Sequence, residues 1–522
     1  MSDLLAKKPL NTILDEAAET GEHSLRRALG PTNLITLGIG AIIGTGIFVL
    51  TGTAAANHAG PAIILSFILA AIACIFAGLC YAEFASMIPV AGSAYTYGYA
   101  TLGEIFAWII GWDLILEYAF GAATVASGWS GYVLSLLGDF GITLSPRWAG
   151  APGTVFVFFD GHWSNLSKIT KALELAHVDP ATLPHQTSAF NLFGFIGIAL
   201  VTIILVIGIK ESANFNSFIV IIKVCVLIVF LVLGAKYILG HRAEADLNWT
   251  PFIPPNLGAY GKFGWSGIAT AAGVIFFAYI GFDAVSTAAQ ESKNPKRDMP
   301  IGILGSLAIC TVLYILVAAV LTGLVNYKLL DIPDPIAVGI NQTGVGWGKL
   351  LVKVGAICGL SSTMVVMLLG QSRVFFSMSK DGLLPKWASE VHPRFRTPYK
   401  SSIFVGIFVA LFAAFIPIAI LGELVSIGTL LAFIIVCAGV WVLRARKTDV
   451  PRAFVTPWVP FTPIMGIVIS FLMMYSLGWE TWLRLVVWLV IGMCVYFFYG
   501  RHHSRVQILA SQARKPGSAM AD

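Results

Sequence analysis

Twelve stretches of this chain are apolar over about 20 residues or more, and this feature limits its possible folds most strongly. An α-helix rises 1.5 Å per residue, so about 20 residues cross the roughly 30 Å of hydrocarbon in a bilayer. The stretches lie at 33–56, 62–88, 104–137, 190–209, 217–239, 267–290, 301–325, 347–378, 401–422, 424–443, 460–478 and 481–500. Hydrocarbon offers the backbone no hydrogen-bond partner, so such stretches must be helical. The sequence therefore predicts an all-α membrane protein with twelve transmembrane helices.

The composition agrees with one membrane domain and no soluble domain. Hydrophobic residues make up 57% of the chain, charged residues 11%, and the mean hydropathy is +0.82, whereas soluble domains are about a quarter charged. We expect a cytoplasmic segment at 1–32, a transporter domain at 33–500 and a cytoplasmic tail at 501–522. The first segment is polar and lacks the pattern of a cleavable signal peptide. The loop at about 139–189 is polar, and we expect one short helix near 167–176.

The distribution of Lys and Arg predicts the orientation of the chain. If the N-terminus is cytoplasmic, the cytoplasmic segments hold 21 of these residues and the outer loops hold six. Basic residues gather on the cytoplasmic side of membrane proteins, so both termini are expected to lie there. The formal net charge of +6 is thus a topology signal, and no nucleic-acid partner is expected. The predicted location is a cell (inner) membrane, crossed many times.

The sequence gives no sign of an enzyme, a metal site or a cofactor. Its seven cysteines all lie in predicted spans without metal-type spacing, which is typical of small buried side chains. P-loop, HExxH and GxSxG motifs are absent, which argues against an ATP-driven pump and against familiar hydrolases.

Two of the stretches contain glycines at corresponding places. The first, 33–56, holds Gly38, Gly40, Gly44 and Gly46, and the sixth, 267–290, reads AGVIFFAYIGFD at 272–283. Each opens a block of five spans, so the second block is inverted relative to the first. Glycine-interrupted helices at matching positions of two halves indicate a transporter binding site. The alternative is close helix packing on small residues, for which Gly40 and Gly44 have the spacing.

Broken helices would expose backbone groups that suit an amino acid. The N–H groups of residues 44–46 could bind a carboxylate, with the Thr45 hydroxyl as a further donor, because free N–H groups carry partial positive charge. The carbonyls of Phe277, Ala278 and Ile280 could bind an ammonium group. Both ends of a zwitterion would then be recognised by backbone, and side chains would select its R group.

Ionisable residues inside spans are costly and each needs a reason. Lys223 lies in the apolar run IVIIKVCV at 219–226, and burial that disfavours its charged form would let it exchange a proton near neutral pH; the alternative is snorkelling to the interface. Asp113 and Glu117 share one helical face and belong either to the substrate path or to an internal polar network. Glu83 and Glu104, near the cytoplasmic boundary, are expected to be structural.

Four segments together resemble a known family. They are GAIIGTGIF at 40–48, YAEFASMIPVAGSAYTY at 81–97 continuing to Gly103 and Glu104, FFAYIGFDA at 276–284, and RVFFSMSKDGLLP at 373–385. The chain resembles the amino acid–polyamine–organocation superfamily over about residues 22–500, and its cationic amino acid transporter branch in particular. Animal members of that branch have further C-terminal helices, so the branch name does not imply a cationic substrate.

The resemblance implies a LeuT-type fold: two inverted repeats of five helices, about 33–239 and 267–443, plus two peripheral helices at 460–500. It implies alternating access around a central site, and a proton-coupling lysine on the fifth helix that links helices 1, 5 and 8. The side-chain pocket of helices 3, 6 and 8 corresponds to Glu117, Phe277 and Met367. The expected substrate-binding residues are Ile42, Ile43, Gly44, Thr45, Gly46, Glu117, Phe277, Ala278, Ile280 and Met367, and Lys223 is the expected proton-coupling residue.

The leading hypothesis is a proton-coupled symporter of an L-amino acid. An exchanger or polyamine carrier is the neighbouring hypothesis, and a nutrient-sensing receptor belongs to a different class; a channel is disfavoured because no ring-forming filter is evident. The side chain of the substrate stays open: Glu117 suits a cationic one, whereas bulky Phe277 and Met367 favour a small or medium neutral one.

Overall fold

The computed structural model describes residues 4–9, 29–88, 93–207, 213–395, 397–446 and 452–508. In this part, eight helical segments are long and apolar enough to cross a membrane by length and composition: Gly46–Met87, Glu104–Asp139, Phe218–Gly240, Gly264–Ala289, Pro295–Leu324, Gly346–Lys380, Ile418–Arg446 and Trp479–His503. Four shorter apolar helices are Pro31–Ile42, Leu192–Ile207, Tyr399–Phe415 and Phe461–Ser476. Each of the twelve predicted stretches is covered by these helices over most of its length.

The α-helices are α2 (Pro31–Ile42), α3 (Thr51–Ala54), α4 (Ile63–Met87), α5 (Ser93–Thr101), α6 (Glu104–Ile115), α7 (Gly121–Asp139), α8 (Leu166–Leu175), α9 (Leu192–Ile207), α10 (Ala213–Gly240), α11 (Arg242–Asn248), α12 (Gly264–Ile275), α13 (Pro295–Leu324), α14 (Pro335–Gln342), α15 (Gly346–Lys380), α16 (Tyr399–Phe415), α17 (Ile418–Arg446), α18 (Phe461–Ser476), α19 (Trp479–Val495) and α20 (Arg501–His503). π-Helical turns at Gly46–Leu50, Ala55–Ala59, Leu116–Phe120 and Tyr496–Gly500 widen four of the helical segments.

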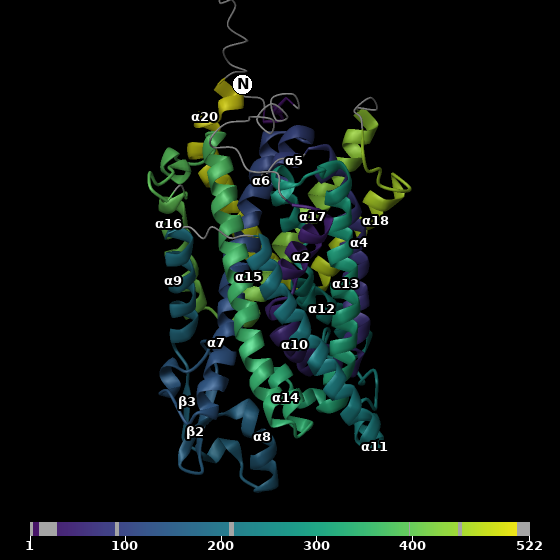
Figure 1. The fold of residues 1–522 in the computed structure, drawn as a ribbon, viewed down its shortest axis with the longest axis vertical. Helices are drawn as coiled ribbons and strands as arrows, with labels where there is room; N and C mark the ends of the chain where they lie inside the picture. The colour runs from purple at the N-terminus through teal and green to yellow at the C-terminus, as the bar shows by residue number, and fades with distance from the viewer. Residues whose placement is uncertain are drawn as a thin grey trace, which may run out of the picture.

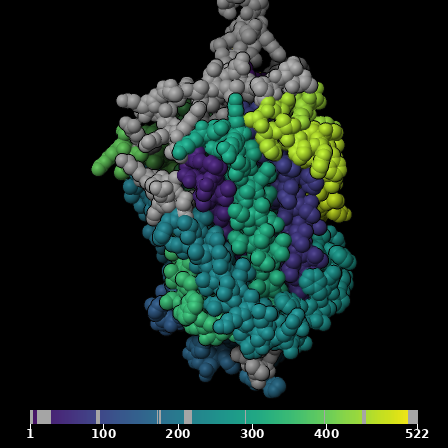
Figure 2. Space-filling view, turned by 45° about the vertical axis from the view of Figure 1, so that its right-hand side comes forward, coloured from purple at the N-terminus to yellow at the C-terminus, as the bar shows by residue number. Residues whose placement is uncertain are grey.

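The long helices run side by side along the longest axis of the molecule (Figure 1). α13 packs against both α2 and α4, α15 packs against α7 and α10, and α17 packs against α18. Figure 2 shows α13, in teal, between α2 and α4, in purple and blue-violet. The short, broken α2 is thereby surrounded by longer helices from both halves of the chain, which holds its C-terminal end near the middle of the bundle.

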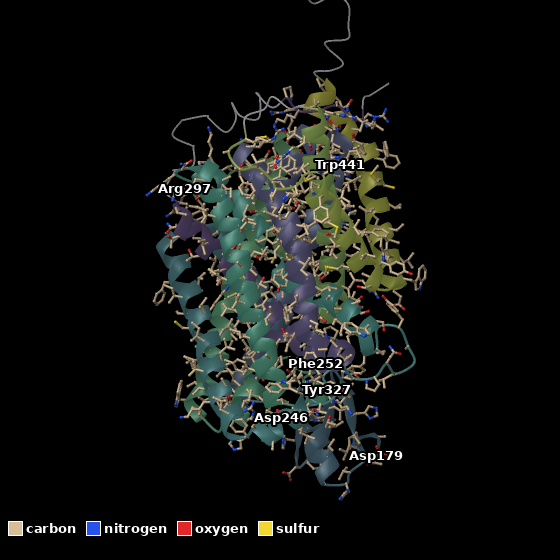
Figure 3. The ribbon with its side chains drawn as sticks, turned by 90° about the vertical axis from the view of Figure 1, so that its right-hand side faces the viewer. Asp179, Asp246, Phe252, Arg297, Tyr327 and Trp441 are labelled. Atoms are coloured by element: carbon tan, nitrogen blue, oxygen red, sulfur yellow. The ribbon has the colours of Figure 1, made fainter. Side chains whose placement is uncertain are left out.

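The two ends of the bundle carry different parts of the chain. The N-terminus, α5, α20 and the start of α16 lie at one end, and α8, α11, α14 and the strands lie at the other (Figure 1). Arg297 and Trp441 lie toward the first end, and Asp179, Asp246 and Tyr327 toward the second (Figure 3). The segments predicted to be cytoplasmic are therefore on one side and the predicted outer loops on the other.

The predicted boundary between the ninth and tenth spans was wrong. The expected gap at residue 423 lies inside α17, and the chain leaves the helix at Ile416 and Pro417 instead. Proline lacks an N–H group and disfavours helical geometry at the residue before it, and Ile416 is extended with ψ of 133°. The proline, rather than the polar Gly422-Glu423 pair, is the physical stop signal.

The all-α prediction was incomplete, because the 139–189 loop contains a small antiparallel sheet. Its strands are β1 (Val155–Phe159), β2 (His162–Asn165) and β3 (His185–Thr187), in the order β2-β1-β3. Phe156 pairs with Asn165 on one side and with Gln186 on the other. Asp160 and Gly161 connect β1 and β2 with positive φ values of 51° and 78°, which is the backbone that a two-residue type I′ hairpin turn needs. The expected short helix is present as α8.

Candidate functional site

The first transmembrane helix is interrupted where the glycines predicted. α2 ends at Ile42, and Ile43 turns to an extended conformation with ψ of 98°. The second half continues through the π-helical turn Gly46–Leu50, and the Phe48 N–H donates back to the Gly44 carbonyl at 3.3 Å. The N–H groups of residues 44–46 precede that first bond, so they have no acceptor within the helix. Free N–H groups and free carbonyls thus meet in the middle of the bundle.

The sixth transmembrane helix has a matching interruption. α12 passes into a 3-10 turn at Phe276–Tyr279, after which Ile280 is extended with ψ of 136°. Gly281 has φ of +115°, and a Cβ atom there would lie 2.9 Å from the Ala41 carbonyl carbon. Glycine therefore satisfies both the backbone conformation and the close approach to the first helix. The chain then continues as the 3-10 helix Asp283–Glu291.

The two interruptions lie directly against each other. A Cβ atom added to Gly46 would lie 2.2 Å from Ala278 Cα, so the backbones of the first and sixth helices are in van der Waals contact. Of the carbonyls expected to bind an ammonium group, that of Phe277 already accepts the Ile280 N–H at 3.2 Å. A carbonyl oxygen has two lone pairs, so Phe277 keeps one for a ligand, and its role stays a prediction together with those of Ala278 and Ile280.

Lys223 is completely buried and bonds to the broken first helix. Its Nζ donates to the carbonyls of Gly40 at 2.8 Å and Ile43 at 3.1 Å, and to Thr363 Oγ1 at 2.9 Å. α10 thereby joins α2 to α15, which are the three helices that the resemblance named. Snorkelling to the interface is excluded, because the ammonium group faces the break. Three carbonyl and hydroxyl oxygens around one ammonium group make it a strong cap for the helix end.

Of the three consecutive hydroxyl residues Ser361, Ser362 and Thr363 on α15, only Thr363 bonds to the lysine. Ser361 accepts the indole N–H of Trp129 at 2.9 Å, and Ser362 donates to the Gly359 carbonyl at 3.0 Å. The Thr363 hydroxyl also lies 3.1 Å from the Ile43 carbonyl oxygen. Ser361 and Ser362 point elsewhere, since neighbouring residues on a helix point about 100° apart.

A tyrosine that the sequence did not single out completes this end of the break. The Tyr314 hydroxyl of α13 donates to the Ile42 carbonyl at 2.9 Å. The carbonyls freed at the C-terminal end of α2 are thus held by helices 5, 7 and 8, whereas the N–H side faces Ala278. No sequence signal could have found Tyr314, because its hydroxyl is the polar tip of a side chain within an otherwise apolar run.

Thr45 carries an unpaired donor at the centre of this arrangement. Its side chain is fully buried and its Oγ1 has no hydrogen-bond partner among the described residues. A Cβ atom at Gly128 of α7 would lie 2.8 Å from Thr45 Cγ2, so the threonine faces the third helix. An unpaired buried hydroxyl costs free energy unless a ligand bonds to it, which agrees with the expected role of Thr45.

The residues expected to read the side chain lie on the third helix and its neighbours. Glu117 is in the π-helical turn Leu116–Phe120 and faces Asp283 and Thr429. The Tyr118 hydroxyl donates to Asp283 Oδ2 at 3.3 Å. Met367 Sδ would lie 2.9 Å from a Cβ atom at Gly121, one turn beyond Glu117. The Glu117 carboxyl therefore lies beside that of Asp283, although neither Glu117 oxygen has a hydrogen-bond partner among the described residues. The sequence had placed Asp283 beside the break without assigning it a role.

All of these residues are closed off from both sides. No side chain of the expected site is more than 4% exposed, from Ile42 to Met367. Toward the outer loops, Lys353 Nζ bonds Asp139 Oδ2 at 2.6 Å and the Ser135 carbonyl at 3.0 Å. At the opposite end, Lys8 Nζ bonds Asp381 Oδ1 at 2.9 Å. The broken helices are therefore buried between two ends of the bundle, each of which is joined by an ion pair.

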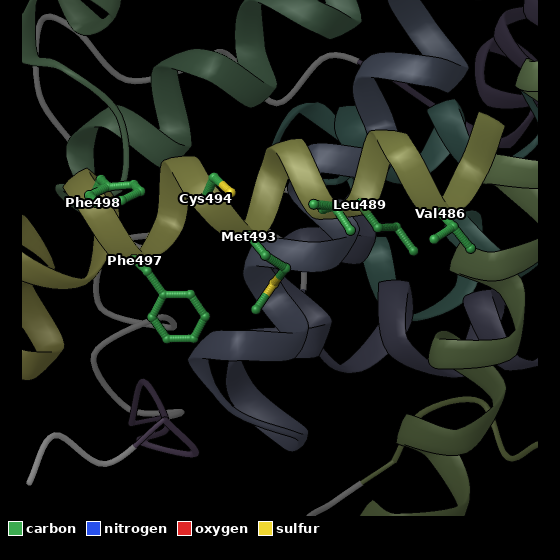
Figure 4. A pocket seen from close by; sticks show the side chains of 7 residues that line it. Val486, Leu489, Met493, Cys494, Phe497 and Phe498 are labelled. Carbon is green, nitrogen blue, oxygen red and sulfur yellow. The ribbon is translucent and has the colours of Figure 1, made fainter. Parts of the chain in front are cut away.

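An apolar groove on the outside of the bundle is separate from this site. It is lined by Val486, Leu489, Val490, Met493, Cys494, Phe497 and Phe498 along α19 and the turn that follows it (Figure 4). None of the expected site residues contributes to it. Its side chains have the composition of a lipid-facing helix surface.

Comparison with known proteins agrees with this geometry. A family model described as amino acid permease matches residues 29–501. The chain is 44% identical to a branched-chain amino acid permease of Bacillus subtilis, over 96% of this chain and 98% of the relative. It is 42% identical to a methylthioribose transporter of the same organism, over 97% and 99%. A vacuolar cationic amino acid transporter of Arabidopsis thaliana is 30% identical, over 97% and 96%.

Proposed function

The chain belongs to the amino acid permease family, and on that premise we propose that it carries an L-amino acid across a cell membrane by proton-coupled symport. The observation that supports this most is the direct contact of the two helix breaks at Gly46 and Ala278. One break offers free N–H groups and the other offers carbonyls, so a zwitterion fits with its carboxylate on residues 44–46 and its ammonium group on Ala278 and Ile280. Thr45 Oγ1 is the further donor.

The proposed architecture is twelve spans with a LeuT-type inverted repeat. Residues 33–239 and 267–443 would form the two repeats, and residues 460–500 the two peripheral helices. The matching places of the breaks, each in the first helix of its repeat, support this arrangement. Alternating access would then open the ends of the bundle in turn around a fixed central site.

Lys223 is the proposed coupling residue. Its three bonds tie α10 to the first-helix carbonyls and to Thr363 of α15. Loss of the proton would remove the positive charge that holds these groups together, and so would change the relative stability of the outward-open and inward-open states. A proton shifts such an equilibrium only if it binds the two states differently, and a lysine that keeps its partners in one state alone meets that condition.

We propose a neutral apolar side chain of medium size for the substrate. Phe277 and Met367 are apolar and buried, and Glu117 faces the Asp283 carboxyl, with which it can share a proton instead of pairing with a cationic side chain. The name of the 44% identical relative, a branched-chain amino acid permease, agrees with this choice. The 42% identical methylthioribose transporter makes a thioether sugar the second candidate substrate.

Competition uptake in proteoliposomes tests the proposal. Labelled leucine is taken up with an imposed pH gradient, and each of the twenty amino acids and methylthioribose is added as a competitor. We expect leucine, isoleucine and valine to compete best, and arginine and lysine to compete at least ten-fold less well. Best competition by arginine would reject the neutral substrate, and competition by methylthioribose alone would reject amino acid transport. Uptake that needs an internal amino acid and ignores the pH gradient would indicate an exchanger.

A further inference from the structure

Six acidic side chains of the described residues are buried to 1% exposure or less. One of them, Asp334 at the start of α14, accepts from the Ser135 hydroxyl, and the other five fall into two classes. Glu83 accepts from Arg444 and from the Thr456 N–H, and Glu104 accepts from Tyr99, Tyr496 and Ser504. These two are satisfied, as was expected of structural residues. The other three, Asp113, Glu117 and Asp283, have no basic partner in the described part of the chain.

Asp113 is the most isolated of the three. It is 1% exposed, and neither of its carboxyl oxygens has a hydrogen-bond partner among the described residues. Glu117 and Asp283 face each other, and Tyr118 and Thr429 lie beside them, so that pair can share a proton. Asp113 has no such neighbour. An ionised carboxylate without a partner in an apolar interior costs several kcal/mol or more, so Asp113 must hold its own proton in this state.

The elements packed around Asp113 offer no charge that would change this conclusion. On α17, Gly428 lies against it, with a Cβ position 3.6 Å from Asp113 Oδ1, and Cys437 is the single ionisable residue between Glu423 and Arg444. The charged groups of the neighbouring helices are engaged elsewhere: Arg484 with Glu423, Arg444 with Glu83, and Arg373 with Glu291. The one titratable group of the described residues that interacts with Asp113 is Glu117, one turn further along the same helix.

Asp113 also lies between the central site and one end of the bundle. It is nine residues from Glu104, whose partners Ser504 and Tyr496 belong to the C-terminal end of the chain. At 1.5 Å per residue this places Asp113 about 14 Å along the helix from Glu104 and about 6 Å short of Glu117. The expected cytoplasmic end is thus reached from Asp113 along the interface of α6 and α17.

We propose that Asp113 is a second proton site of this protein, separate from Lys223. In this structure its carboxyl is un-ionised against the backbone of α17 at Gly428. When α17 separates from the third helix at the cytoplasmic end, water reaches the carboxyl, the O–H bond breaks, and the proton passes to that water as the carboxylate becomes hydrated. The direction of this step rests on the proposed transport function, whereas the protonated state does not.

Infrared difference spectroscopy tests the protonated state without any transport measurement. Purified wild type, Asp113→Asn and Glu83→Gln proteins are compared for the C=O stretch of a protonated carboxylic acid at neutral pH. We expect Asp113→Asn to lose one such band, and Glu83→Gln to keep all bands, because Glu83 forms ion pairs with Arg444 and Arg452. An unchanged spectrum for Asp113→Asn overturns the proposal. If Asp113→Asn does not fold, the second test uses Asp283→Asn protein labelled with ¹³C-aspartate. Its C=O band of a protonated acid must then shift relative to unlabelled Asp283→Asn protein, and the absence of a shift overturns the proposal.

Uptake in proteoliposomes tests the release step. Asp113→Asn should bind labelled leucine within two-fold of wild type, yet its uptake rate should lose its dependence on the pH of the cytoplasmic side. Restoration of that dependence by Asp113→Glu supports proton release, since a purely structural role would not return with the longer acid. An unchanged pH profile in Asp113→Asn overturns the release step. Wild type that takes up no amino acid rejects the proposed function instead, and leaves the infrared result standing.

Discussion

At the scale of single residues, Gly46 shows how one hydrogen atom in place of a side chain permits the site. A side chain at position 46 would block access to the free N–H groups of residues 44–46. The structure gives a stronger reason, since a Cβ atom would lie 2.2 Å from Ala278 Cα and 2.4 Å from its Cβ. A substitution must therefore push the first and sixth helices apart.

We expect Gly46→Val to lower substrate affinity at least 100-fold, since the two breaks could no longer face each other. Equilibrium binding of labelled leucine to purified protein measures this. Gly138→Ala, at the end of α7 where no atom lies within 4 Å of the added Cβ, is the matched control and should bind normally. Wild-type affinity in Gly46→Val would remove residues 44–46 from the site.

Lys223 makes a second prediction at this scale. Lys223→Ala removes bonds to Gly40, Ile43 and Thr363, and it should abolish accumulation driven by a pH gradient while some substrate binding remains. The exposed Lys236 of the same helix supplies the control, because Lys236→Ala keeps every contact at the break. If Lys223→Ala still concentrates substrate when only a pH gradient is imposed, Lys223 has a structural role.

At the scale of elements, residues 4–9 form an N-terminal strap across the start of α6. The carbonyls of Leu4 and Ala6 accept the N–H groups of Ile105 and Glu104 at 3.1 and 3.0 Å. These are first-turn N–H groups, which a helix cannot satisfy from within. The strap thereby caps the third helix, and its Lys8 reaches Asp381 at the end of α15.

Asp381 links this strap to two further elements. It accepts from Lys8 and also from the Tyr95 hydroxyl of α5 at 2.8 Å. Burial and the nearby Asp381 carboxylate raise the pKa of the Tyr95 phenol well above its ordinary value, so the hydroxyl stays a donor throughout the physiological pH range. A single carboxylate therefore joins the N-terminus, α5 and α15.

We expect Lys8→Ala to open this end of the bundle more often, because it removes a largely buried ion pair, which is worth about 1 kcal/mol or more. The measurement is the alkylation rate of a cysteine at the buried Ser372 of α15 in inside-out vesicles, with the seven native cysteines replaced by alanine. The rate should rise about five-fold. Lys380→Ala, next to Asp381 but without a bond to it, should leave the rate unchanged, and an equal rise in both variants would contradict a specific role of Lys8.

The elements also show what the sequence could predict. Both helix breaks followed from glycine placement, and Lys223 was conspicuous as one charge in an apolar run, because hydrocarbon makes each such feature expensive. The helices that Lys223 joins followed from the family resemblance. The N-terminal strap could not be predicted from the sequence, since a polar N-terminal segment has the same composition whether or not it binds a helix end. The sheet had a signal, Asp160-Gly161 between aromatic runs, but a hairpin outside the membrane leaves no trace in hydropathy.

At the scale of the whole molecule, the closed state is held at two ends by ion pairs of the same kind. Lys353 and Lys349 bond Asp139 near the outer loops, and Lys8 bonds Asp381 at the other end. If the proposed alternating access operates, only one end opens at a time, and each ion pair must then break without the other. The buried site, which includes Lys223 and lies near Asp113, would then be open to the solution on only one side of the membrane in each state.

The distribution of Lys and Arg predicts which end of the bundle faces the cytoplasm, and this gives the last prediction. The helices α5 and α20 and the start of α16 share one end (Figure 1), and Lys400 at the start of α16 pairs with Glu390. Asp179 lies at the other end (Figure 3). The first end carries most of the Lys and Arg, so it should be cytoplasmic. In intact cells, an impermeant thiol reagent should label a cysteine at Asp179 and should not label one at Glu390 until the cells are opened. Labelling of Glu390→Cys in intact cells would invert the orientation, and with it the side to which Asp113 releases its proton.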